Sequence, residues 1–310
     1  MIYFLLTEFR NFLFDKEILR SHKLPGFTIS VGNIELGGTG KTPTVIAICK
    51  LLLSRGQRPV ILTRGYKSGL KNLEWALLKD GKYLQSPRLL MADEAMECSC
   101  VLNGVPVVLG ANRFGAAQEF LKVDKDYHPT HWILDDGFQH RRLQRNVDFV
   151  LVTPSFSLSP WAVLPFGRQR ESGKNVARAT AVLLSKFPDP VGNKVKDLTP
   201  YNPTVLPLEF KFEGLSQVSG EVSKVGQNPI VVTGIAKADV LYANLRHYGI
   251  SFKKTFQYRD HERIPWETFA DQDTYITTAK DFYREAPPSH LKIFIAANSA
   301  ILNSKVVEIL

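Results

Sequence analysis

The order of apolar and polar positions predicts buried strands that alternate with helices over much of the chain. Several apolar, β-branched runs stop at glycine or polar residues, as parallel strands do when helices cover both faces of a sheet. These runs occupy residues 27–32, 60–63, 105–110, 132–134, 147–153 and 180–186. We therefore expect an α/β fold, with a parallel sheet that carries helices on both faces.

The regular alternation is lost between residues 187 and 228, where prolines mark a linker. Within it, the run 205–212 and a later piece near 218–225 predict a two-stranded ribbon. A second strand–loop–helix series follows, with strands expected at 229–233, 274–278 and 291–296. The expected parts are a helix within 1–22, a core domain over 23–204, a two-stranded linker or hinge over 205–228 and a smaller α/β domain over 229–310.

Residues 1–20 combine an apolar helical pattern with nearby positive charge. The apolar side chains that share one face of the predicted helix are Ile2, Leu5, Leu6, Phe9, Phe12 and Leu13. Basic residues in or near the segment are Arg10, Lys16, Arg20 and Lys23. One interpretation is a helix that lies in the headgroup layer of a membrane. The other is a docking helix whose apolar face covers the protein core.

Composition and charge narrow the class of protein. Of the 310 residues 44% are hydrophobic, which excludes a disordered chain, and the net charge of +9 favours anionic partners. Three cysteines cannot build a disulfide framework, and no apolar run approaches the roughly 20 residues that span a bilayer. Charged residues interrupt the N-terminal apolar stretch, so we expect no cleavable signal peptide. Interleaved aromatic and basic recognition patterns are missing, so we expect no nucleic-acid partner.

A phosphate-binding loop is predicted directly after the first strand. The segment NIELGGTGKTP (33–43) lies between that strand and an apolar helical run over 45–53, which is the context such a loop requires. Glycines bring main-chain N–H groups toward an anion, Lys41 neutralises the β- and γ-phosphates, and the Thr42 hydroxyl binds Mg²⁺. Glu35 stands where the usual pattern has its first glycine. The expected nucleotide-binding residues are Glu35, Leu36, Gly37, Gly38, Thr39, Gly40, Lys41 and Thr42.

Two adjacent aspartates, Asp135 and Asp136, follow the apolar run 132–134. In a parallel sheet this position puts both carboxylates at the edge where ligands bind. One of them can hold Mg²⁺ directly or through water, since close carboxylates repel unless a cation lies between them. A solvated turn is the simpler alternative. The basic run HRRLQR (140–145) then either faces solvent or receives an acidic substrate.

Arg64 and Arg113 each follow a strand, on the same edge of the sheet as the phosphate loop, and Asp93 and Glu94 occupy the loop between them. Arg168, Arg170 and Glu171 belong to a turn-rich loop over 164–171. Each of these charges alone is typical of a protein surface, whereas their joint placement after strands favours a functional site. In the second half, Asp260 and His261 form a pair that either serves as base and partner or is structural.

Taken together, these segments resemble the tetraacyldisaccharide 4′-kinase family, membrane-associated lipid A kinases of Gram-negative bacteria. The resemblance covers most of the chain and is specific because a glycine-pair phosphate loop is combined with DDGFQHRRL. The segments that carry it are FRNFLFDKEIL (9–19), SVGNIELGGTGKTP (30–43), TRGYK (63–67), ADEA (92–95), LDDGFQHRRLQR (134–145), LPFGRQRE (164–171), TGIAKAD (233–239), RDHE (259–262) and TTAKD (277–281). The family's usual GDEP reads ADEA here, which keeps both acids.

The resemblance implies transfer of the ATP γ-phosphate to the 4′-hydroxyl of a tetraacyldisaccharide 1-phosphate, a lipid A precursor, to give lipid IVA. It implies a P-loop NTPase-like core joined by a flexible two-stranded hinge to the smaller domain, with ATP and Mg²⁺ as cofactors. The expected location is peripheral, on an anionic membrane at the cytoplasmic face of the bacterial inner membrane, with no obligate protein partner. The alternative is a regulatory NTPase or metallochaperone-like switch that hydrolyses nucleotide without a lipid acceptor.

The resemblance also assigns roles to individual residues. Asp93 would be the base for the sugar hydroxyl, paired with His261, and Lys41, Asp135 and Asp136 complete the catalytic set. The implied metal ligands are Thr42, Asp135 and Asp136. The implied substrate contacts are Arg64, Tyr66, Arg113, Gln139, His140, Arg170 and Glu171.

Overall fold

The structure, a computed structural model, describes residues 2–65, 68–71, 73–88, 92–186, 192–217, 228–235, 238–259, 262–285 and 287–310. The chain forms two compact units. Unit 1 comprises Met1–Leu90, Cys98–Phe210 and Ala300–Leu310, and unit 2 comprises Met91–Glu97 and Lys211–Ser299. The C-terminal residues group with unit 1, whereas the sequence pattern alone assigns them to the smaller domain.

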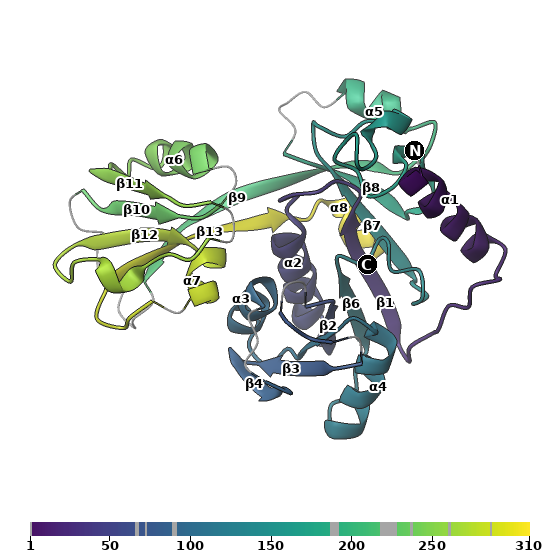
Figure 1. Cartoon of the computed structure of the whole chain (residues 1–310), viewed down its shortest axis with the longest axis horizontal. Helices are drawn as coiled ribbons and strands as arrows, with labels where there is room; N and C mark the ends of the chain where they lie inside the picture. The colour runs from purple at the N-terminus through teal and green to yellow at the C-terminus, as the bar shows by residue number, and fades with distance from the viewer. Residues whose placement is uncertain are drawn as a thin grey trace. The chain divides into compact units, whose positions relative to one another are not determined.

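Unit 1 is built on a mostly parallel sheet, which confirms the predicted α/β class (Figure 1). Its parallel strands are β1 (Phe27–Asn33), β2 (Pro59–Thr63), β5 (Val107–Gly110), β6 (His131–Asp135), β7 (Val147–Val152), β8 (Ala181–Ser185) and the first part of β9 (Val205–Gln217). Their hydrogen-bonded order is β9-β8-β7-β1-β6-β2-β5. Strand β1 therefore lies between β6 and β7, and its carboxyl end is the point where an open parallel sheet holds a ligand.

The helices of unit 1 are α1 (Ile2–Asp15), α2 (Lys41–Ser54), α4 (Arg113–Val123), α5 (Gly192–Leu198) and α8 (Ser304–Ile309), with 3-10 turns η1 (Pro160–Ala162) and η2 (Gly173–Arg178). Helix α2 packs against β1, β2 and β6, and α4 packs against β2, β3 and β5. Alternate residues of β2 and β6 share one core cluster with α4, as the period of two in a strand requires: Val60, Leu62, Trp132, Leu134 and Phe120.

One edge of this sheet was not predicted. Strand β3 (Trp75–Lys79) pairs antiparallel with β5 and with β4 (Lys82–Gln85). Most of β4 is exposed, so its side chains show no apolar pattern that would reveal a strand. Helix α3 (Asp93–Val101) begins at Asp93, in a segment that the sequence pattern assigns to a loop.

Unit 2 is a smaller parallel α/β structure. Its strands run in the order β11-β10-β12-β13-β9, with β10 (Ile230–Thr233), β11 (Lys254–Gln257), β12 (Thr274–Thr278) and β13 (Lys292–Ile301). Its helical elements are α6 (Ala238–His247), η3 (Trp266–Thr268) and α7 (Ala279–Glu285). The strands expected at 229–233, 274–278 and 291–296 are confirmed, whereas β11 was missed because its residues are largely exposed.

The chain passes between the units four times: before Met91, within α3 after Glu97, in β9 after Phe210 and in β13 after Ser299. Strands β9 and β13 are neighbours in the hydrogen-bonded order. The sequence pattern pairs 205–212 with a piece near 218–225, but residues 218–227 lie outside the described part of the chain. Across the described ranges, no helix is both long enough and apolar enough to cross a bilayer.

Candidate functional site

The phosphate loop joins the carboxyl end of β1 to the first residue of α2, Lys41. Gly37 and Gly40 have φ angles of 113° and 90°, in the left-handed region that favours glycine. A β-carbon at Gly40 would also lie 2.4 Å from the ring of Phe210. Because Leu36, Gly37 and Gly38 are exposed, the loop presents main chain to solvent at the positive end of a helix.

Side chains beneath the loop fix its shape. The Asn33 side-chain amide donates to the Glu35 carbonyl at 2.7 Å and to the Thr39 hydroxyl at 3.0 Å. The Ser185 hydroxyl, at the end of β8, donates to the Thr39 carbonyl at 2.6 Å, and Lys186 Nζ donates to the Gly38 carbonyl at 2.6 Å. These bonds hold loop carbonyls away from the exposed side, which leaves that side for N–H groups and an anion.

Glu35 explains the departure from the usual loop pattern. Its side chain is buried, with 3% of the residue exposed. Its carboxylate accepts hydrogen bonds from the Thr153 N–H, the Thr153 hydroxyl and the Ser155 hydroxyl at 2.6–3.0 Å. Thr153 directly follows β7, so Glu35 fastens the loop to the neighbouring strand. The residue predicted to contact nucleotide is thus a buried anchor of the loop.

The aspartate turn lies at the carboxyl end of β6, next to β1. Asp136 has a φ of 52°, an uncommon conformation for any residue but glycine, and one that aspartate tolerates better than most. Its Oδ1 lies 3.6 Å from Lys41 Nζ, and its Oδ2 accepts a hydrogen bond from Arg170 at 2.6 Å. The turn and the phosphate loop therefore meet at one ion-paired centre.

Opposing effects set the ionisation of Asp136. Burial raises its pKa. The positive charges of Lys41, Arg170 and Arg113 lower the pKa by a larger amount, so the net pKa lies below the ordinary value for a carboxyl group. Asp136 is accordingly a carboxylate over the whole neutral range.

Arg113, the first residue of α4, supports this turn from below. Its guanidinium donates to the main-chain carbonyls of Asp135 at 2.9 Å and of Asp136 at 3.1 and 3.2 Å. Only 3% of the residue is exposed, and burial lowers its pKa to about 10. Arg113 therefore contacts the turn through its backbone and stays charged at neutral pH.

The donor set at this centre fits Mg²⁺. Within the described part of the chain, no group of three or more His, Cys, Asp or Glu side chains is arranged to hold a metal. Mg²⁺ does not require one, because it is usually held by one or two carboxylates together with waters and substrate phosphates. The buried Oδ1 of Asp136 accepts no hydrogen bond in the structure, although Lys41 Nζ lies 3.6 Å from it, which leaves this oxygen for a cation.

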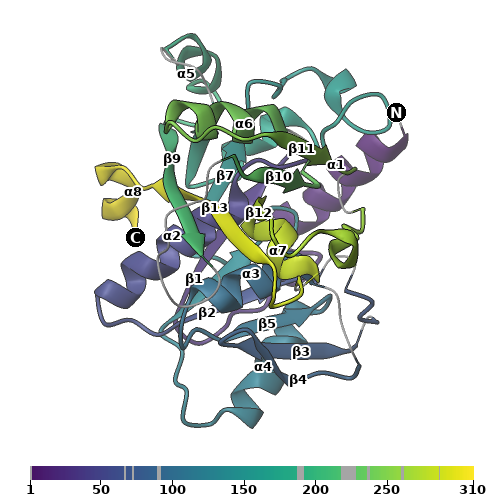
Figure 2. The ribbon, with the colours of Figure 1, turned by 90° about the vertical axis from the view of Figure 1, so that its left-hand side faces the viewer.

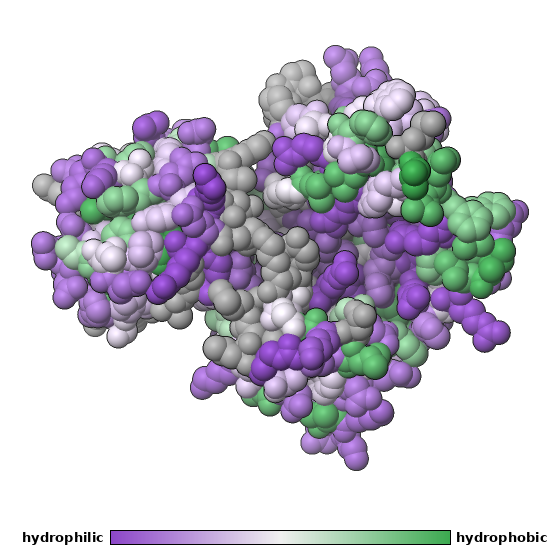
Figure 3. Space-filling model, viewed as in Figure 1, coloured by the Kyte–Doolittle hydropathy of each residue, from purple (hydrophilic) through white to green (hydrophobic). Residues whose placement is uncertain are grey.

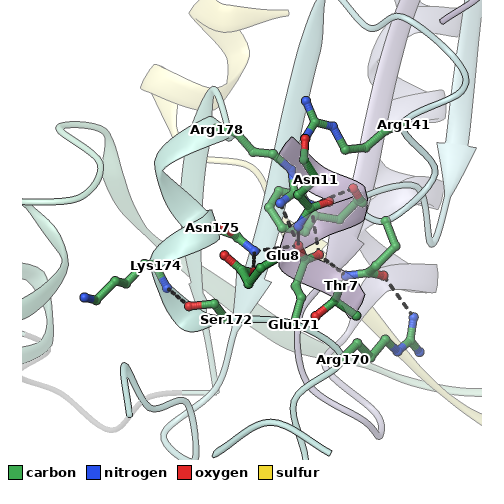
Figure 4. A network of polar contacts seen from close by, with 12 residues as sticks. Thr7, Glu8, Asn11, Arg141, Arg170, Glu171, Ser172, Lys174, Asn175 and Arg178 are labelled. Carbon is green, nitrogen blue, oxygen red and sulfur yellow. Dashed lines mark hydrogen bonds and ion pairs between the residues drawn. The ribbon is translucent and has the colours of Figure 1, made fainter. Parts of the chain in front are cut away.

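A second polar network surrounds Glu171, whose side chain is fully buried (Figure 4). Arg178 binds both carboxylate oxygens, at 2.6 and 2.8 Å. Gln139, Asn11 and Asn175 donate to the same carboxylate at 2.8–3.0 Å. Burial raises the Glu171 pKa, but hydrogen bonds from Arg178 and the charge of Arg178 more than reverse this, and the net pKa is lowered. This anchoring role differs from the substrate contact that the resemblance implies.

Helix α1 is docked by its polar residues. Its one buried residue is Asn11, and Glu8 accepts a hydrogen bond from Asn175 at 2.9 Å. The Tyr3 hydroxyl donates to the Arg170 carbonyl at 3.1 Å, and Arg141 donates to the Asn11 carbonyl at 2.9 Å. The helix therefore lies against the core through the side that an ordinary amphipathic helix turns to water.

Most of the apolar side chains of α1 face outward, whereas Phe4, Leu13 and Phe14 are half-buried. Hydrophobic surface gathers over this helix in Figure 3, and Figure 2 shows the helix from a second direction. The exposed apolar residues of the helix, with their exposed fractions, are Ile2 75%, Tyr3 39%, Leu5 58%, Leu6 61%, Phe9 60% and Phe12 49%. This arrangement contradicts the docking interpretation, in which the apolar face covers the core.

The remaining predicted residues are placed as follows. Asp93 is half-buried at the first position of α3, and Arg64 is exposed just after β2. Gln139 also donates to the Asn33 carbonyl at 2.8 Å, and the half-buried His140 follows it. Tyr66 and His261 lie outside the described residues.

Sequence reasoning missed the residues that hold the site together. They are Asn11, Asn33, Arg178 and Ser185. Only Asn33 gave a local signal, as a polar residue directly after a buried strand. Asn11 belongs to the segment 9–19 that carries the family resemblance but was given no role, and Arg178 and Ser185 lie in no motif.

The chain is similar to known proteins over almost its whole length. The family model described as tetraacyldisaccharide-1-P 4′-kinase (LpxK) matches residues 1–310. The chain is 33% identical to a tetraacyldisaccharide 4′-kinase of Chlorobium phaeovibrioides, over 94% of this chain and 86% of that protein. It is 30% identical to one of Geobacter metallireducens, over 99% of this chain and 93% of that protein.

A solved structure is similar over almost the whole chain. The crystal structure of LpxK from Aquifex aeolicus in complex with ATP superposes with a TM-score of 0.81 at 26% identity, covering 99% of this chain and 95% of that one. With the glycine-rich loop, the aspartate turn and the full-length family match in agreement, the chain belongs to the tetraacyldisaccharide-1-P 4′-kinase family.

Proposed function

We propose that this protein transfers the γ-phosphate of ATP to the 4′-hydroxyl of a tetraacyldisaccharide 1-phosphate and so produces lipid IVA. The observation that carries the proposal is the meeting of Lys41, at the end of the phosphate loop, with Asp136 of the aspartate turn. A chain with this centre and with full-length membership of a kinase family is a phosphotransferase rather than a regulatory NTPase. The switch alternative is not favoured.

The nucleotide half of the reaction rests on the phosphate loop. The main-chain N–H groups of Gly37, Gly38 and the start of α2 bind the β- and γ-phosphates, and Lys41 neutralises charge on the transferred group. Bound Mg²⁺, held by Thr42 with Asp135 or Asp136, would neutralise further charge on the phosphates. Arg170, paired with Asp136 at 2.6 Å, adds a second cation beside Lys41. Such fixed charges stabilise the transition state because they need little reorganisation during transfer.

The acceptor half requires a base for the sugar hydroxyl. We assign this role to Asp93, because a carboxylate can accept the hydroxyl proton as the bond to phosphorus forms. The resemblance pairs Asp93 with His261 and adds Arg64 and Tyr66 as substrate contacts, and these assignments are part of the proposal.

Helix α1 supplies the contact with an acylated substrate. Its outward apolar side chains suit the headgroup and acyl boundary of a membrane, and nearby lysines and arginines suit anionic lipid, each contributing about 1 kcal/mol at such a surface. We therefore place the protein peripherally on an anionic membrane, at the cytoplasmic face of the inner membrane.

Product analysis tests the transfer. The purified protein, given Mg·ATP and the tetraacyldisaccharide 1-phosphate in detergent micelles, should yield a lipid heavier by one phosphate, detected by mass spectrometry. Lys41→Ala should yield almost none while it keeps the wild-type melting temperature. ATP hydrolysis that is independent of the lipid, with no phosphorylated lipid, would contradict the proposal.

Vesicle binding tests the membrane contact. A variant with Leu5→Ser, Leu6→Ser and Phe9→Ser should sediment with anionic vesicles at least tenfold less than wild type, because each apolar side chain contributes roughly 1.5–3 kcal/mol when it leaves water. A matched control removes three apolar residues that are equally or more exposed elsewhere, namely Leu73, Leu84 and Val123. Equal loss in both variants would argue against a specific role for α1.

A further inference from the structure

The aspartate turn is held through its main chain by three arginine side chains. The carbonyls of residues 135–138 each accept a hydrogen bond from a guanidinium. Arg113 donates to the first two carbonyls at 2.9–3.2 Å. Arg145 Nη1 donates to the third at 3.1 Å and to the fourth at 3.2 Å, and Arg178 donates to the fourth at 3.0 Å. Three separate segments of unit 1 therefore fix the backbone of the one turn that carries Asp136.

Arg145 has a second, buried partner. It is the last residue of the basic run HRRLQR (140–145), for which the sequence pattern suggests either a solvated face or a contact with an acidic substrate. In the structure only 10% of its side chain is exposed, and Nη1 donates to Oδ2 of Asp148 at 2.8 Å. Asp148 is the second residue of β7, and 10% of its side chain is exposed. The pair therefore ties the guanidinium to the sheet, and the same nitrogen serves the main chain of the turn.

The turn needs such support because its backbone is unusual. Asp136 has a φ of 52°, and a residue other than glycine stays in the left-handed region only where its surroundings fix it there. The next residue, Gly137, donates its N–H to the Val31 carbonyl of β1 at 3.2 Å. Its own carbonyl is one of the two that Arg145 binds. These contacts hold the main chain directly after Asp136, whose carboxylate lies 3.6 Å from Lys41 Nζ.

We propose that Arg145, held by Asp148, is a positioning residue for phosphoryl transfer. Through the backbone of the turn it fixes where the Asp136 carboxylate lies relative to Lys41. The inference rests on the proposed function, in which this centre holds the transferred phosphate. Position matters there because a displacement of about 1 Å can lower a rate roughly 100-fold. Arginine suits the task because its planar, permanently charged group can serve a carboxylate and carbonyls together.

The test uses a variant that keeps the charges in the interior balanced. Arg145→Met alone leaves the buried Asp148 without its cation and should destabilise the fold whatever else Arg145 does. The double variant Arg145→Met, Asp148→Asn removes both charges and should melt close to wild type. Its kcat should nevertheless fall by about tenfold or more, with Kd for ATP within about threefold of wild type because the phosphate loop keeps its own anchors. Arg145→Lys, which keeps the cation, should retain more of the wild-type kcat than the double variant.

A cycle with Asp136→Asn separates positioning from a general structural role. In that background the double variant should lower kcat by less than about twofold, because the carboxylate that Arg145 positions is gone. Single-turnover assays with radiolabelled ATP measure these low rates. A loss as large as in the wild-type background would overturn the inference. As a matched control, Arg55→Met removes an exposed arginine that donates to the Val307 carbonyl at 3.1 Å, and it should keep the wild-type kcat.

Hydrogen exchange provides a readout that does not depend on phosphotransfer. The amides of residues 135–139 should exchange about fivefold or more faster in the double variant than in wild type, the worth of roughly one main-chain hydrogen bond. The amides of β12 in unit 2 should exchange at the wild-type rate. Unchanged exchange in the turn would overturn the inference. If wild type phosphorylates no acceptor while exchange in the turn changes as expected, it is the proposed function that fails.

Discussion

The ion pair between Glu171 and Arg178 offers the sharpest test of how the site is held together. Arg178→Met removes the guanidinium but keeps an unbranched apolar side chain against the ring of Phe138, over which Arg178 stacks at 3.8 Å. The variant leaves a fully buried carboxylate with only neutral donors, from Gln139, Asn11 and Asn175. Breaking a buried pair in this way destabilises a protein by about 3–5 kcal/mol.

For a unit of this size, that loss corresponds to a melting temperature lower by roughly 6–20 °C. Thermal unfolding followed by intrinsic fluorescence measures it. The double variant Glu171→Gln, Arg178→Met should recover a large part of the loss, because the buried charge is gone. As a control, Arg263→Ala removes an exposed partner of Glu267 and should leave the melting temperature almost unchanged.

The pH dependence gives a second, independent readout. The Glu171 pKa is lowered in the folded protein, so its stabilising contribution is present above the unfolded pKa of about 4.3 and is lost as pH falls through the folded value. Without Arg178, burial dominates and the Glu171 pKa rises. The difference in stability between wild type and Arg178→Met should therefore shrink as the pH falls from neutral toward about 4. A difference under about 2 °C at neutral pH, or one that grows on acidification, would refute the reasoning.

Three further predictions concern the reaction itself. Asp93→Ala should lower kcat by roughly 100-fold or more with little change in KM for ATP, measured in steady-state phosphotransfer assays; an unchanged kcat would remove Asp93 from the base role. Glu35→Ala should weaken ATP binding about tenfold in a nucleotide titration, since the loop loses its bonds to Thr153, and Thr153→Val should show a smaller effect in the same direction. The His140 pKa is lowered to about 3, so the imidazole is uncharged throughout the neutral range. The pH–rate profile of His140→Gln should therefore keep the wild-type shape between about pH 5 and 8. Loss of an inflection in the variant would contradict the buried, neutral state.

The local parts of the site were predictable from the sequence. The phosphate loop, the aspartate turn and the parallel strands that precede them are each encoded within about a dozen consecutive residues, where periodicity and glycine spacing act directly. The sequence also predicted in outline that Asp136 and Lys41 lie near each other, because the carboxyl ends of parallel strands share one edge of the sheet.

The supporting contacts could not be predicted. Glu171 bonds Asn11 and Arg178 across sequence separations of 160 and 7 residues, and nothing in the separate segments marks them as partners. The resemblance implies that Arg113 contacts substrate, yet its guanidinium binds main-chain carbonyls of the aspartate turn, which have no sequence signature. The orientation of α1 was likewise open, since an apolar stripe indicates a buried face but does not say whether protein or lipid buries it.

Because α1 docks through its polar residues, its apolar and polar positions should tolerate substitution differently. If α1 contacts acyl chains as proposed, Leu5, Leu6 and Phe9 should exchange freely with other apolar side chains over evolutionary time, because liquid acyl chains impose no fixed shape. Asn11 has one fixed partner at a fixed length and should resist change. We therefore expect the usual rule for soluble proteins to be reversed in this helix, with the apolar positions more variable than the polar residues that dock it, such as Glu8 and Asn11.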